Sequence, residues 1–453
     1  MELALKNIGK LHEANIRCPG FTVIAGENNT GKSTIGRALY LYLKSFYGLD
    51  TYIRSDMVEA LRRNLADPME QFDLMCRRYS NAGRRHKLTR AEEIRRHFAE
   101  QIIDDYYDDL DSAILELGSL HAALYDISDV REIRDSYPAQ YDNWYGTTIQ
   151  TIRDVQRIDG SEIGKRKVTR LTEAFFSGDI ISFGKEEDVA EIHVTKGGYE
   201  NSLSFLRNRK DGSDNCIGLI QNGSVTESVL YIDSPKMVDE LYELSKSVKA
   251  NLPKYLKNYL APAKWQGVEE VNNAMETSVE VEQRKRLLND FSEAIRQDAK
   301  GYLVVNPATE LEFRQTGEKR SVKIRNLSNG VKALSLLEYA IGNGTLKKGD
   351  YLILDEPEIN LHPAWQVEYA RLLVMLQQLL DLNIILTTHT PYFLHAIEVY
   401  AAKAGIADKV AYYAASNQSD GSAVVKDVSA CVDEIYQQLA APIGELENVQ
   451  YGS

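Results

Sequence analysis

Two stretches of this sequence, far apart along the chain, have residue types and spacing suited to phosphate chemistry. The first, 26–33, reads Gly-Glu-Asn-Asn-Thr-Gly-Lys-Ser and matches the P-loop pattern G-x-x-x-x-G-K-[ST] at every position. Its glycines permit a tight turn whose N–H groups face a phosphate, while Lys32 suits the β- and γ-phosphates and Ser33 suits Mg²⁺. The second is Asp355-Glu356, directly after the apolar run Tyr351–Leu354. Adjacent carboxylates at the end of a buried strand are costly unless a cation or a reacting water uses them, so we expect a site for ATP and Mg²⁺.

Two shorter motifs could complete such a site. Leu327-Ser328-Asn329-Gly330 precedes an apolar helix, and a serine and glycine at a helix start offer N–H groups to an anion. A plain N-cap would explain this motif alone, but its place just before the Asp355-Glu356 strand favours a functional role. His389 follows the apolar strand Asn383–Thr388, where it can reach a γ-phosphate. The candidate nucleotide-binding residues are therefore Gly26, Glu27, Asn28, Asn29, Thr30, Gly31, Lys32, Ser33, Thr34, Ser328, Asn329 and Gly330.

The elements around these motifs predict an α/β fold of the P-loop NTPase class. Strands are expected at 2–8, 14–17 and 21–25, and an apolar helix face runs from Lys32 toward Gly48. The domain boundaries we expect are 1–50 for the first part of an ATPase head, 51–185 for a helical insertion, 186–235 for an antiparallel β lobe, 236–300 for a second helical insertion, and 301–453 for the rest of the head.

The β lobe and the first insertion have distinct patterns. Period-two segments around Gly197-Gly198 and Asn222-Gly223 predict two hairpins of one antiparallel meander, which would include 228–232. In the insertion, a basic run at 84–97 precedes acidic pairs at 104–111. These runs are typical of complementary solvated helices, or else of a docking surface for nucleic acid or an acidic protein.

Composition limits the class of protein. The 453 residues suffice for two or three domains, and a net charge of −13 argues against a surface that binds nucleic acid throughout, although a local basic groove stays open. No stretch approaches the roughly 20 apolar residues of a membrane span, and the N-terminus lacks signal-peptide features, so a cytoplasmic protein without a membrane partner is expected. The four cysteines, at 18, 76, 216 and 431, are interpreted as reduced packing residues.

The order of the four motifs resembles the ABC-type ATPase heads of the SMC and RecF-like group within the AAA ATPases. The run Asp-Glu-Pro-Glu-x-x-Leu-His-Pro at 355–363, followed by Thr-His-Thr-Pro at 388–391, is similar to the OLD family and to ATPases of the anti-phage systems Gabija, Septu and PARIS. The resemblance implies that Asp355 and Ser33 hold Mg²⁺, Glu356 polarises the attacking water, and His389 senses the γ-phosphate, with Lys32 as the third candidate catalytic residue.

The resemblance also implies a composite site in a homo-oligomer. Ser328 and Gly330 of a second subunit would close over the γ-phosphate of the first, with Asn360 and His362 at the seam of a head-to-head dimer or a larger assembly. Asn329 stands where many ABC proteins have a second glycine. The glutamine of the Q-loop has only Gln71 and Gln101 as candidates.

Three functions are compatible with these motifs. The expected one is an ATP-hydrolysing sensor or scaffold in anti-phage defence that controls an effector, a nuclease or a toxin, on another chain, because the sequence stops without the acidic cluster of a TOPRIM nuclease. A phage protein or DNA would be its trigger. The alternative is a RecF- or SMC-like DNA-repair or chromosome-associated clamp, for which the basic run at 84–97 is the supporting feature. A transporter subunit would need a membrane partner, which the altered signature and the insertions do not favour.

Overall fold

The computed structural model forms two compact units, Met1–Tyr47 with Lys165–Ser453 and Gly48–Gly164. The residues it describes are 1–61, 63–64, 112, 114–115, 118, 135–136, 138–182, 189–208, 212–233, 289, 293, 301–305, 311–323, 326–342 and 345–441. Gln71, Gln101, Cys76, the basic run at 84–97 and nearly all of the expected second insertion, 236–300, lie outside the described residues. The described part holds no helix that is long and apolar enough to cross a bilayer.

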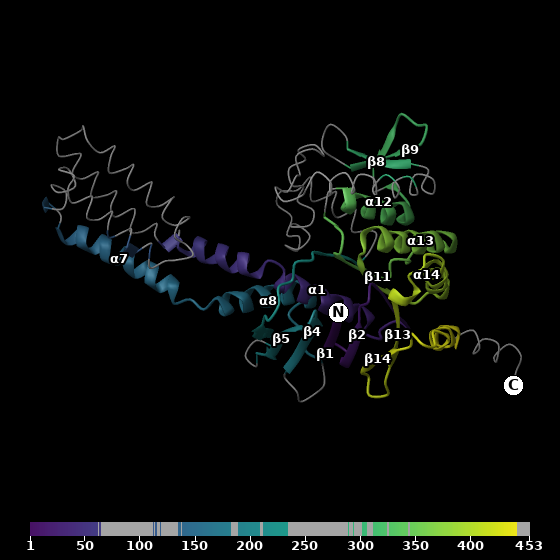
Figure 1. Cartoon of the computed structure of the whole chain (residues 1–453), viewed down its shortest axis with the longest axis horizontal. Helices are drawn as coiled ribbons and strands as arrows, with labels where there is room; N and C mark the ends of the chain where they lie inside the picture. The colour runs from purple at the N-terminus through teal and green to yellow at the C-terminus, as the bar shows by residue number, and fades with distance from the viewer. Residues whose placement is uncertain are drawn as a thin grey trace, which may run out of the picture. The chain divides into compact units, whose positions relative to one another are not determined.

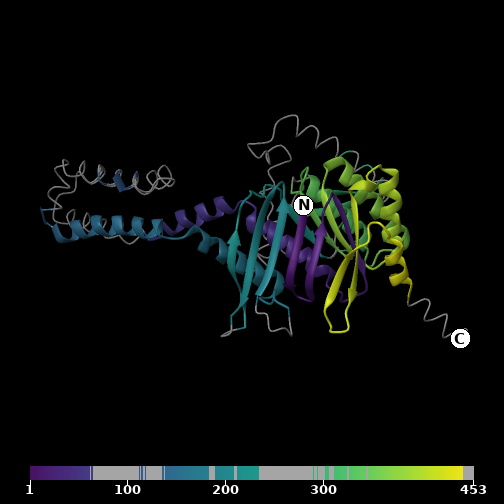
Figure 2. The same ribbon diagram turned by 60° about the horizontal axis from the view of Figure 1, so that its bottom comes forward.

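One mixed sheet of eleven strands organises the larger unit (Figures 1 and 2). Its strands are β1 (Glu2–Ile8), β2 (Leu11–Arg17), β3 (Phe21–Gly26), β4 (Val189–Lys196), β5 (Tyr199–Arg207), β6 (Asp214–Ile220), β7 (Val229–Ile232), β11 (Tyr351–Asp355), β12 (Asn383–Thr388), β13 (Val410–Asn417) and β14 (Ala423–Asp427). Their order across the sheet is β6-β5-β4-β1-β2-β14-β13-β3-β12-β11-β7.

Five of these strands, β13, β3, β12, β11 and β7, run parallel and form the core. Their continuous apolar runs suit strands that are buried on both faces. Leu352 and Leu354 pack into one cluster with buried residues of α12 (Asn329–Gly342), α13 (Pro363–Leu380) and α14 (Pro391–Lys403), which Figure 1 shows together on one side. Between them Ile353 faces α1 (Lys32–Phe46), where a Cβ on Gly36 would lie 3.0 Å from its Cγ2. Helices therefore cover both faces.

An antiparallel lobe extends the sheet beyond β2. β1 pairs with β2 and β4, and β4, β5 and β6 follow as a meander, seen side by side in Figure 2. The face with Leu5, Ile192 and Leu203 is buried, while Glu191 and Glu200 on the other face are not. This alternation is that of a sheet with one solvated face.

The expectation that 228–232 belongs to this meander is wrong. β7 instead pairs parallel with β11, in the register Val229↔Tyr351 to Ile232↔Leu354. All four β7 residues are apolar and buried, so they suit the two-sided burial of the parallel core better than a lobe with a solvated face. The Asn222-Gly223 turn is held by Asn201, whose Oδ1 accepts hydrogen bonds from both backbone N–H groups.

A separate three-stranded sheet leads into α12. The strands β8 (Gly301–Val305), β9 (Leu311–Gln315) and β10 (Ser321–Lys323) pair antiparallel in the order β10-β9-β8. On the other side of the unit, η3 (Ala407–Lys409) precedes β13, and a helix at 433–441 contributes Ile435 to the core.

The smaller unit is helical where it is described. It contains the helical residues 51–61, α7 (Pro138–Gln156) and the start of α8 (Gly160–Phe176), and Trp144 and Ile152 are buried. From Lys165 onward, α8 belongs to the larger unit, whereas the sequence-based boundary was 185.

Of the described cysteines, Cys18 and Cys216 are buried, and burial raises the pKa of the Cys18 thiol to about 11. Cys431 is free but exposed, so the interpretation of all four cysteines as packing residues is wrong for this one. It lies in the segment between β14 and the helix at 433–441.

Candidate functional site

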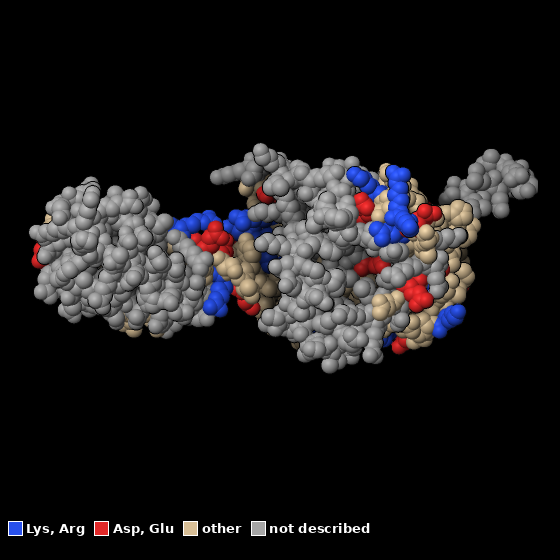
Figure 3. Space-filling view, turned by 90° about the horizontal axis from the view of Figure 1, so that it is seen from above, with Lys and Arg blue, Asp and Glu red and all other residues tan. Residues whose placement is uncertain are grey.

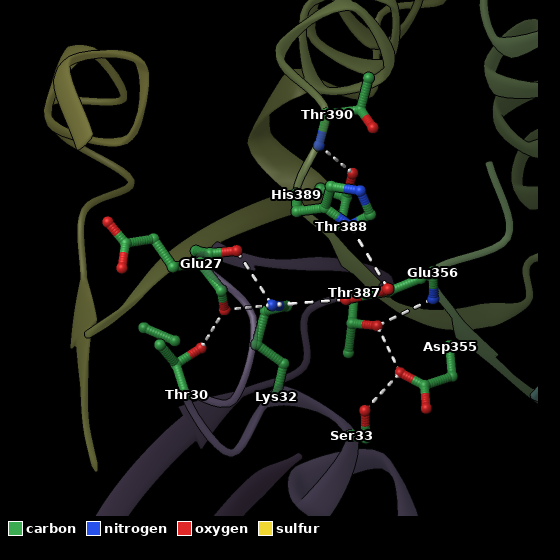
Figure 4. A network of polar contacts seen from close by, with 12 residues as sticks. Glu27, Thr30, Lys32, Ser33, Asp355, Glu356, Thr387, Thr388, His389 and Thr390 are labelled. Atoms are coloured by element: carbon green, nitrogen blue, oxygen red, sulfur yellow. Dashed lines mark hydrogen bonds and ion pairs between the residues drawn. The ribbon is translucent and has the colours of Figure 1, made fainter. Parts of the chain in front are cut away.

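Three adjacent strands end at the same edge of the sheet and bring three of the four expected motifs together. β12 lies between β3 and β11, with Leu386 opposite both Val23 and Leu354. The P-loop therefore follows β3, His389 follows β12, and Glu356 follows β11, all at carboxyl ends. Figure 4 shows their side chains converging. This edge is where open α/β sheets bind ligands.

The backbone of the P-loop requires its glycines. A Cβ on Gly26 would lie 2.2 Å from the backbone oxygen of Ala415 in β13. Gly31 is the left-handed N-cap of α1, with φ 77°, and Asn29 is left-handed as well, with φ 64°. Thr30 Oγ1 donates a 2.8 Å hydrogen bond to the carbonyl of Glu27, which closes the loop. The loop thus keeps the start of α1 close to the sheet edge, where a helix N-terminus favours an anion.

Lys32 lies at the centre of this arrangement. Its Nζ donates hydrogen bonds to the carbonyls of Gly26 (2.9 Å) and Glu27 (2.6 Å), and it lies 3.4 Å from Glu356 Oε1. The side chain is only 3% exposed. A buried ammonium carried by the first residue of a helix is a strong point charge for a phosphate.

Asp355 is surrounded by hydroxyl groups. Its Oδ1 accepts from Ser33 Oγ (2.8 Å) and from Thr387 Oγ1 (2.6 Å), and its Oδ2 accepts from Tyr231 OH (3.3 Å). Thr387 Oγ1 also accepts a 2.9 Å hydrogen bond from the backbone N–H of Glu356. A hydroxyl and a carboxylate side by side are hard oxygen ligands of the kind that Mg²⁺ prefers, so Ser33 and Asp355 fit the expected metal site.

Glu356 is held by the shape of its backbone. Its φ of 45° is left-handed, which is uncommon for a residue with a Cβ and turns its side chain toward Lys32 and His389. His389 Nδ1 lies 3.3 Å from Glu356 Oε2. The interaction with His389, and then the charge of Lys32, hold the pKa of Glu356 below its usual value despite burial. The same contact raises the pKa of His389, against the effects of burial and of Lys32.

The arrangement of these residues agrees with a comparison of the chain with protein-family models. The family model described as AAA ATPase domain matches residues 1–394. The chain belongs to this family. It has the α/β fold of a P-loop NTPase.

Solved structures similar to this AAA ATPase domain include SMC heads. An SMC head domain from Thermotoga maritima has 12% identity, with 94% of this chain and 98% of that chain covered and a TM-score of 0.39. An Smc head bound to the C-winged helix domain of ScpA has 14% identity, coverage of 96% and 98%, and a TM-score of 0.41. An Smc head domain with a coiled coil and joint from Pyrococcus yayanosii has 14% identity, coverage of 97% and 99%, and a TM-score of 0.35. No curated protein sequence matches the chain.

The Ser328-Asn329-Gly330 motif of this AAA ATPase domain lies at the N-terminus of α12. Ser328 is exposed, and its carbonyl accepts the backbone hydrogen bond from Lys332 that begins the helix. Gly330 is buried, and a Cβ there would lie 3.3 Å from the ring of Trp365. Among the described contacts, none joins these three residues to the P-loop, so within one chain they stand apart from the polar network of Figure 4.

Two further residues expected near the site of the AAA ATPase domain belong to the segment after Glu356. Asn360 is exposed and left-handed, with φ 63°, and Ile359 beside it is exposed as well. His362 is the N-cap of α13, and its Nδ1 accepts a 3.3 Å hydrogen bond from the backbone of Ala364.

Sequence reasoning missed five residues at this edge. Thr387 hydrogen-bonds Asp355, and Thr388 hydrogen-bonds Glu358 behind His389. The order Thr-Thr-His is visible in the sequence, but polar residues at the end of a buried strand were not expected to belong to the site. Tyr231, on β7, could not be placed because its strand was assigned to the meander. Asp233 follows β7 next to Asp355, and its pKa is raised by burial and by the charge of Asp355.

Proposed function

We propose that this chain binds ATP with Mg²⁺ and hydrolyses it to ADP and phosphate at the edge formed by β3, β12 and β11. The observation that carries this proposal is the 3.4 Å approach of Lys32 to Glu356, because it brings the P-loop cation and the candidate base to one point. The contact of Glu356 with His389 adds a third group to this position, from the end of β12. Phosphoryl transfer needs positioning and charge neutralisation more than covalent chemistry, and these groups supply both.

Each group has one task in this mechanism. The N–H groups of 26–34 and the Lys32 ammonium bind the phosphates, and Ser33 and Asp355 hold the metal. Mg²⁺, when bound, neutralises charge on the β- and γ-phosphates. Glu356 orients the attacking water and accepts its proton, for which its lowered pKa keeps it ionised. The imidazolium of His389, whose pKa is raised, donates a hydrogen bond to the γ-phosphate.

The same proposal makes the site composite. Ser328, Asn329 and Gly330 of a second copy close over the γ-phosphate, and Asn360 and His362 lie at the seam of the resulting homo-oligomer. The exposure of Ser328 and Asn360 supports this, since each can meet a partner without refolding. At least two copies are needed, and larger assemblies satisfy the same geometry.

In the cell, we propose, this ATPase is the sensor or scaffold of an anti-phage defence system. It controls an effector on a separate chain, a nuclease or a toxin, in response to a phage protein or DNA. The support is the motif at 355–363 with Thr-His-Thr-Pro at 388–391, which is similar to the ATPases of PARIS, Septu, Gabija and OLD. In this proposal, hydrolysis or release of ATP changes how tightly the ATPase binds the effector.

A pull-down with the Glu356→Gln variant from native cells tests this role, because that variant should accumulate with ATP bound. Proteins and nucleic acids that co-purify are identified together, and Lys32→Ala protein is the matched control that cannot hold ATP. A stoichiometric nuclease or toxin-like protein, retained by Glu356→Gln and lost with Lys32→Ala, is the expected result. Recovery of nuclease-resistant DNA and no protein partner would contradict the defence role.

A second candidate function, a DNA clamp, is favoured by one surface. Figure 3 looks onto the side of the three-stranded sheet, where lysine and arginine side chains gather with carboxylates beside them. Lys319, Arg320 and Lys323 on β10 and the turn before it are all exposed. A clamp built on this hairpin predicts DNA binding that weakens steeply with salt, and that Lys319→Glu with Arg320→Glu abolishes. Binding that is unchanged by both substitutions removes this candidate.

A further inference from the structure

Glu358 carries a buried carboxyl group directly behind Glu356 and His389, the candidate catalytic pair. The residue is 1% exposed and lies two positions after Glu356. Its Oε1 accepts a 2.5 Å hydrogen bond from Thr388 Oγ1 and a 3.2 Å hydrogen bond from the backbone N–H of His389. A side chain from the loop after β11 is thereby hydrogen-bonded to the last residue of β12 and to the residue that follows it.

The loop after β11 is folded so that its two glutamates point to different places. The left-handed backbone at Glu356 and two tight turns, Ile359 N–H to Glu356 O and Leu361 N–H to Glu358 O, reverse the chain. Gln366 Nε2 donates to the carbonyl of Leu361 (3.2 Å) and lies 3.5 Å from that of Glu358. Glu356 consequently faces Lys32, while Glu358 turns inward with its own backbone held.

Packing alone does not account for a carboxyl group here. Glu358 Oε2 is buried, and among the described residues it has no hydrogen-bond partner. A buried polar atom without a partner destabilises a fold, so an apolar side chain of similar shape would cost less. The contacts of Oε1 are what distinguish glutamate from such a side chain.

We propose that Glu358 is a positioning residue, which fixes the main chain of His389 so that the imidazole meets Glu356. This inference rests on the proposed hydrolysis for its consequence in turnover, but the geometry it concerns belongs to the chain alone. Glu356, Glu358 and Lys32 are the charged groups that act on the imidazole, two carboxylates raising the pKa of His389 and the lysine lowering it. Burial raises the pKa of Glu358 itself.

The test compares Glu358→Ala with Glu358→Gln. Glutamine keeps an acceptor oxygen for Thr388 and His389, whereas alanine removes it. Glu358→Ala should lower ATP turnover by about 10- to 10²-fold with the ATP affinity within about 2-fold of wild type, since a small displacement of a reacting group has effects of this size. Glu358→Gln should restore most of the turnover.

A double-mutant cycle separates positioning from general weakening of the fold. In a His389→Ala background, Glu358→Ala should cause no further loss of turnover, because its effect runs through His389. Losses that multiply would overturn the proposal, as would turnover of Glu358→Ala equal to that of wild type.

A second readout needs no nucleotide. NMR titration of the His389 imidazole, assigned by the signal lost in His389→Ala, should show a lower pKa in Glu358→Ala than in Glu358→Gln. Both variants lack the Glu358 charge, but only in the alanine variant does the ring move away from Glu356. The His193 signal serves as the control. A His389 pKa that is the same in both variants overturns the proposal even if wild-type protein fails to hydrolyse ATP, so the two failures are distinguishable.

Discussion

Ser33 Oγ lies 2.8 Å from Asp355 Oδ1, although 322 residues separate them in the chain. This hydrogen bond joins the first turn of α1 to the end of β11 and brings the two proposed metal ligands together. Thr387, from β12, bonds the same carboxylate oxygen. Residues from α1, β11 and β12 thus place their side-chain oxygen atoms around one position.

Lys32→Ala should weaken ATP binding by about 10²-fold or more. Each charge-assisted hydrogen bond contributes about 1.5–3 kcal/mol, and about 1.4 kcal/mol is a factor of ten in affinity. Equilibrium binding of a fluorescent ATP analogue measures the change, with Lys6→Ala, on the exposed face of β1, as the control. Near wild-type affinity in Lys32→Ala would remove the P-loop assignment.

Glu356→Gln should bind ATP normally and hydrolyse it more slowly by on the order of 10²-fold or more, because the base is lost while the shape is kept. Phosphate release under saturating ATP measures turnover. Glu2→Gln, at an exposed position of β1, is the matched control and should turn over as wild type. Turnover within a few-fold of wild type in Glu356→Gln would assign the base elsewhere.

Gly26→Ala should destabilise the fold by at least about 1–3 kcal/mol, because the new Cβ would lie 2.2 Å from the Ala415 backbone oxygen, and β3 or β13 must shift. Thermal unfolding in the absence of nucleotide checks this. Gly146→Ala, in α7, meets nothing within 4 Å and should be neutral or stabilising by about 1 kcal/mol. Equal melting temperatures for both variants would show that the backbone contact at Gly26 is not rigid.

The Glu356–His389 pair predicts a pH-dependent contribution to stability. The folded protein raises the pKa of His389 above 6.5, so this contribution is complete below pH 6.5 and is lost as pH rises through the folded pKa. It lowers the pKa of Glu356 below 4.5, so that contribution is present above pH 4.5 and is lost as pH falls through the folded pKa. The difference in Tm between wild type and His389→Gln should therefore be largest between pH 4.5 and 6.5.

Thermal unfolding across pH 4 to 9 tests this pair in nucleotide-free protein. His12→Gln, at an exposed position of β2, is the control for the loss of a histidine. A Tm difference for His389→Gln that stays constant across that range would contradict the coupling of the two groups.

Ser328→Arg should block association of the heads while leaving ATP binding by one chain intact. The side chain is exposed at the start of α12, so arginine should not disturb the monomer. Light scattering of the Glu356→Gln background with ATP reports the assembly, and Ser419→Arg, in the exposed β13–β14 turn, is the control. Hydrolysis at the wild-type rate in Ser328→Arg would rule out a composite site.

The parts of the site that sequence alone predicted share one property: each is a short motif whose chemistry is complete within a few residues. The P-loop, the Asp355-Glu356 pair and His389 each follow an apolar run, and the rule that ligands bind at the carboxyl ends of parallel strands was enough to expect them at one edge. The arrangement of β3, β12 and β11 confirms that expectation.

What could not be predicted depends on contacts between distant segments. β7 has the same apolar composition whether it joins a hairpin or the parallel core, and only its pairing with β11 decides. The positions of Tyr231 and Asp233 near Asp355 follow from that pairing. The hydrogen-bond partners of Glu358 depend on the left-handed backbone at Glu356. The sequence does not predict this conformation, because glutamate rarely adopts it.

The position of β3 has a consequence for synthesis of the chain. Both of its neighbours, β12 and β13, are made long after it, so the apolar residues 21–25 leave the ribosome with no strand to pair with. An unpaired apolar strand is a template for association with other chains. The strand gains both of its partners only once residue 417 has been translated, so the sheet edge that carries the proposed site is assembled late in synthesis.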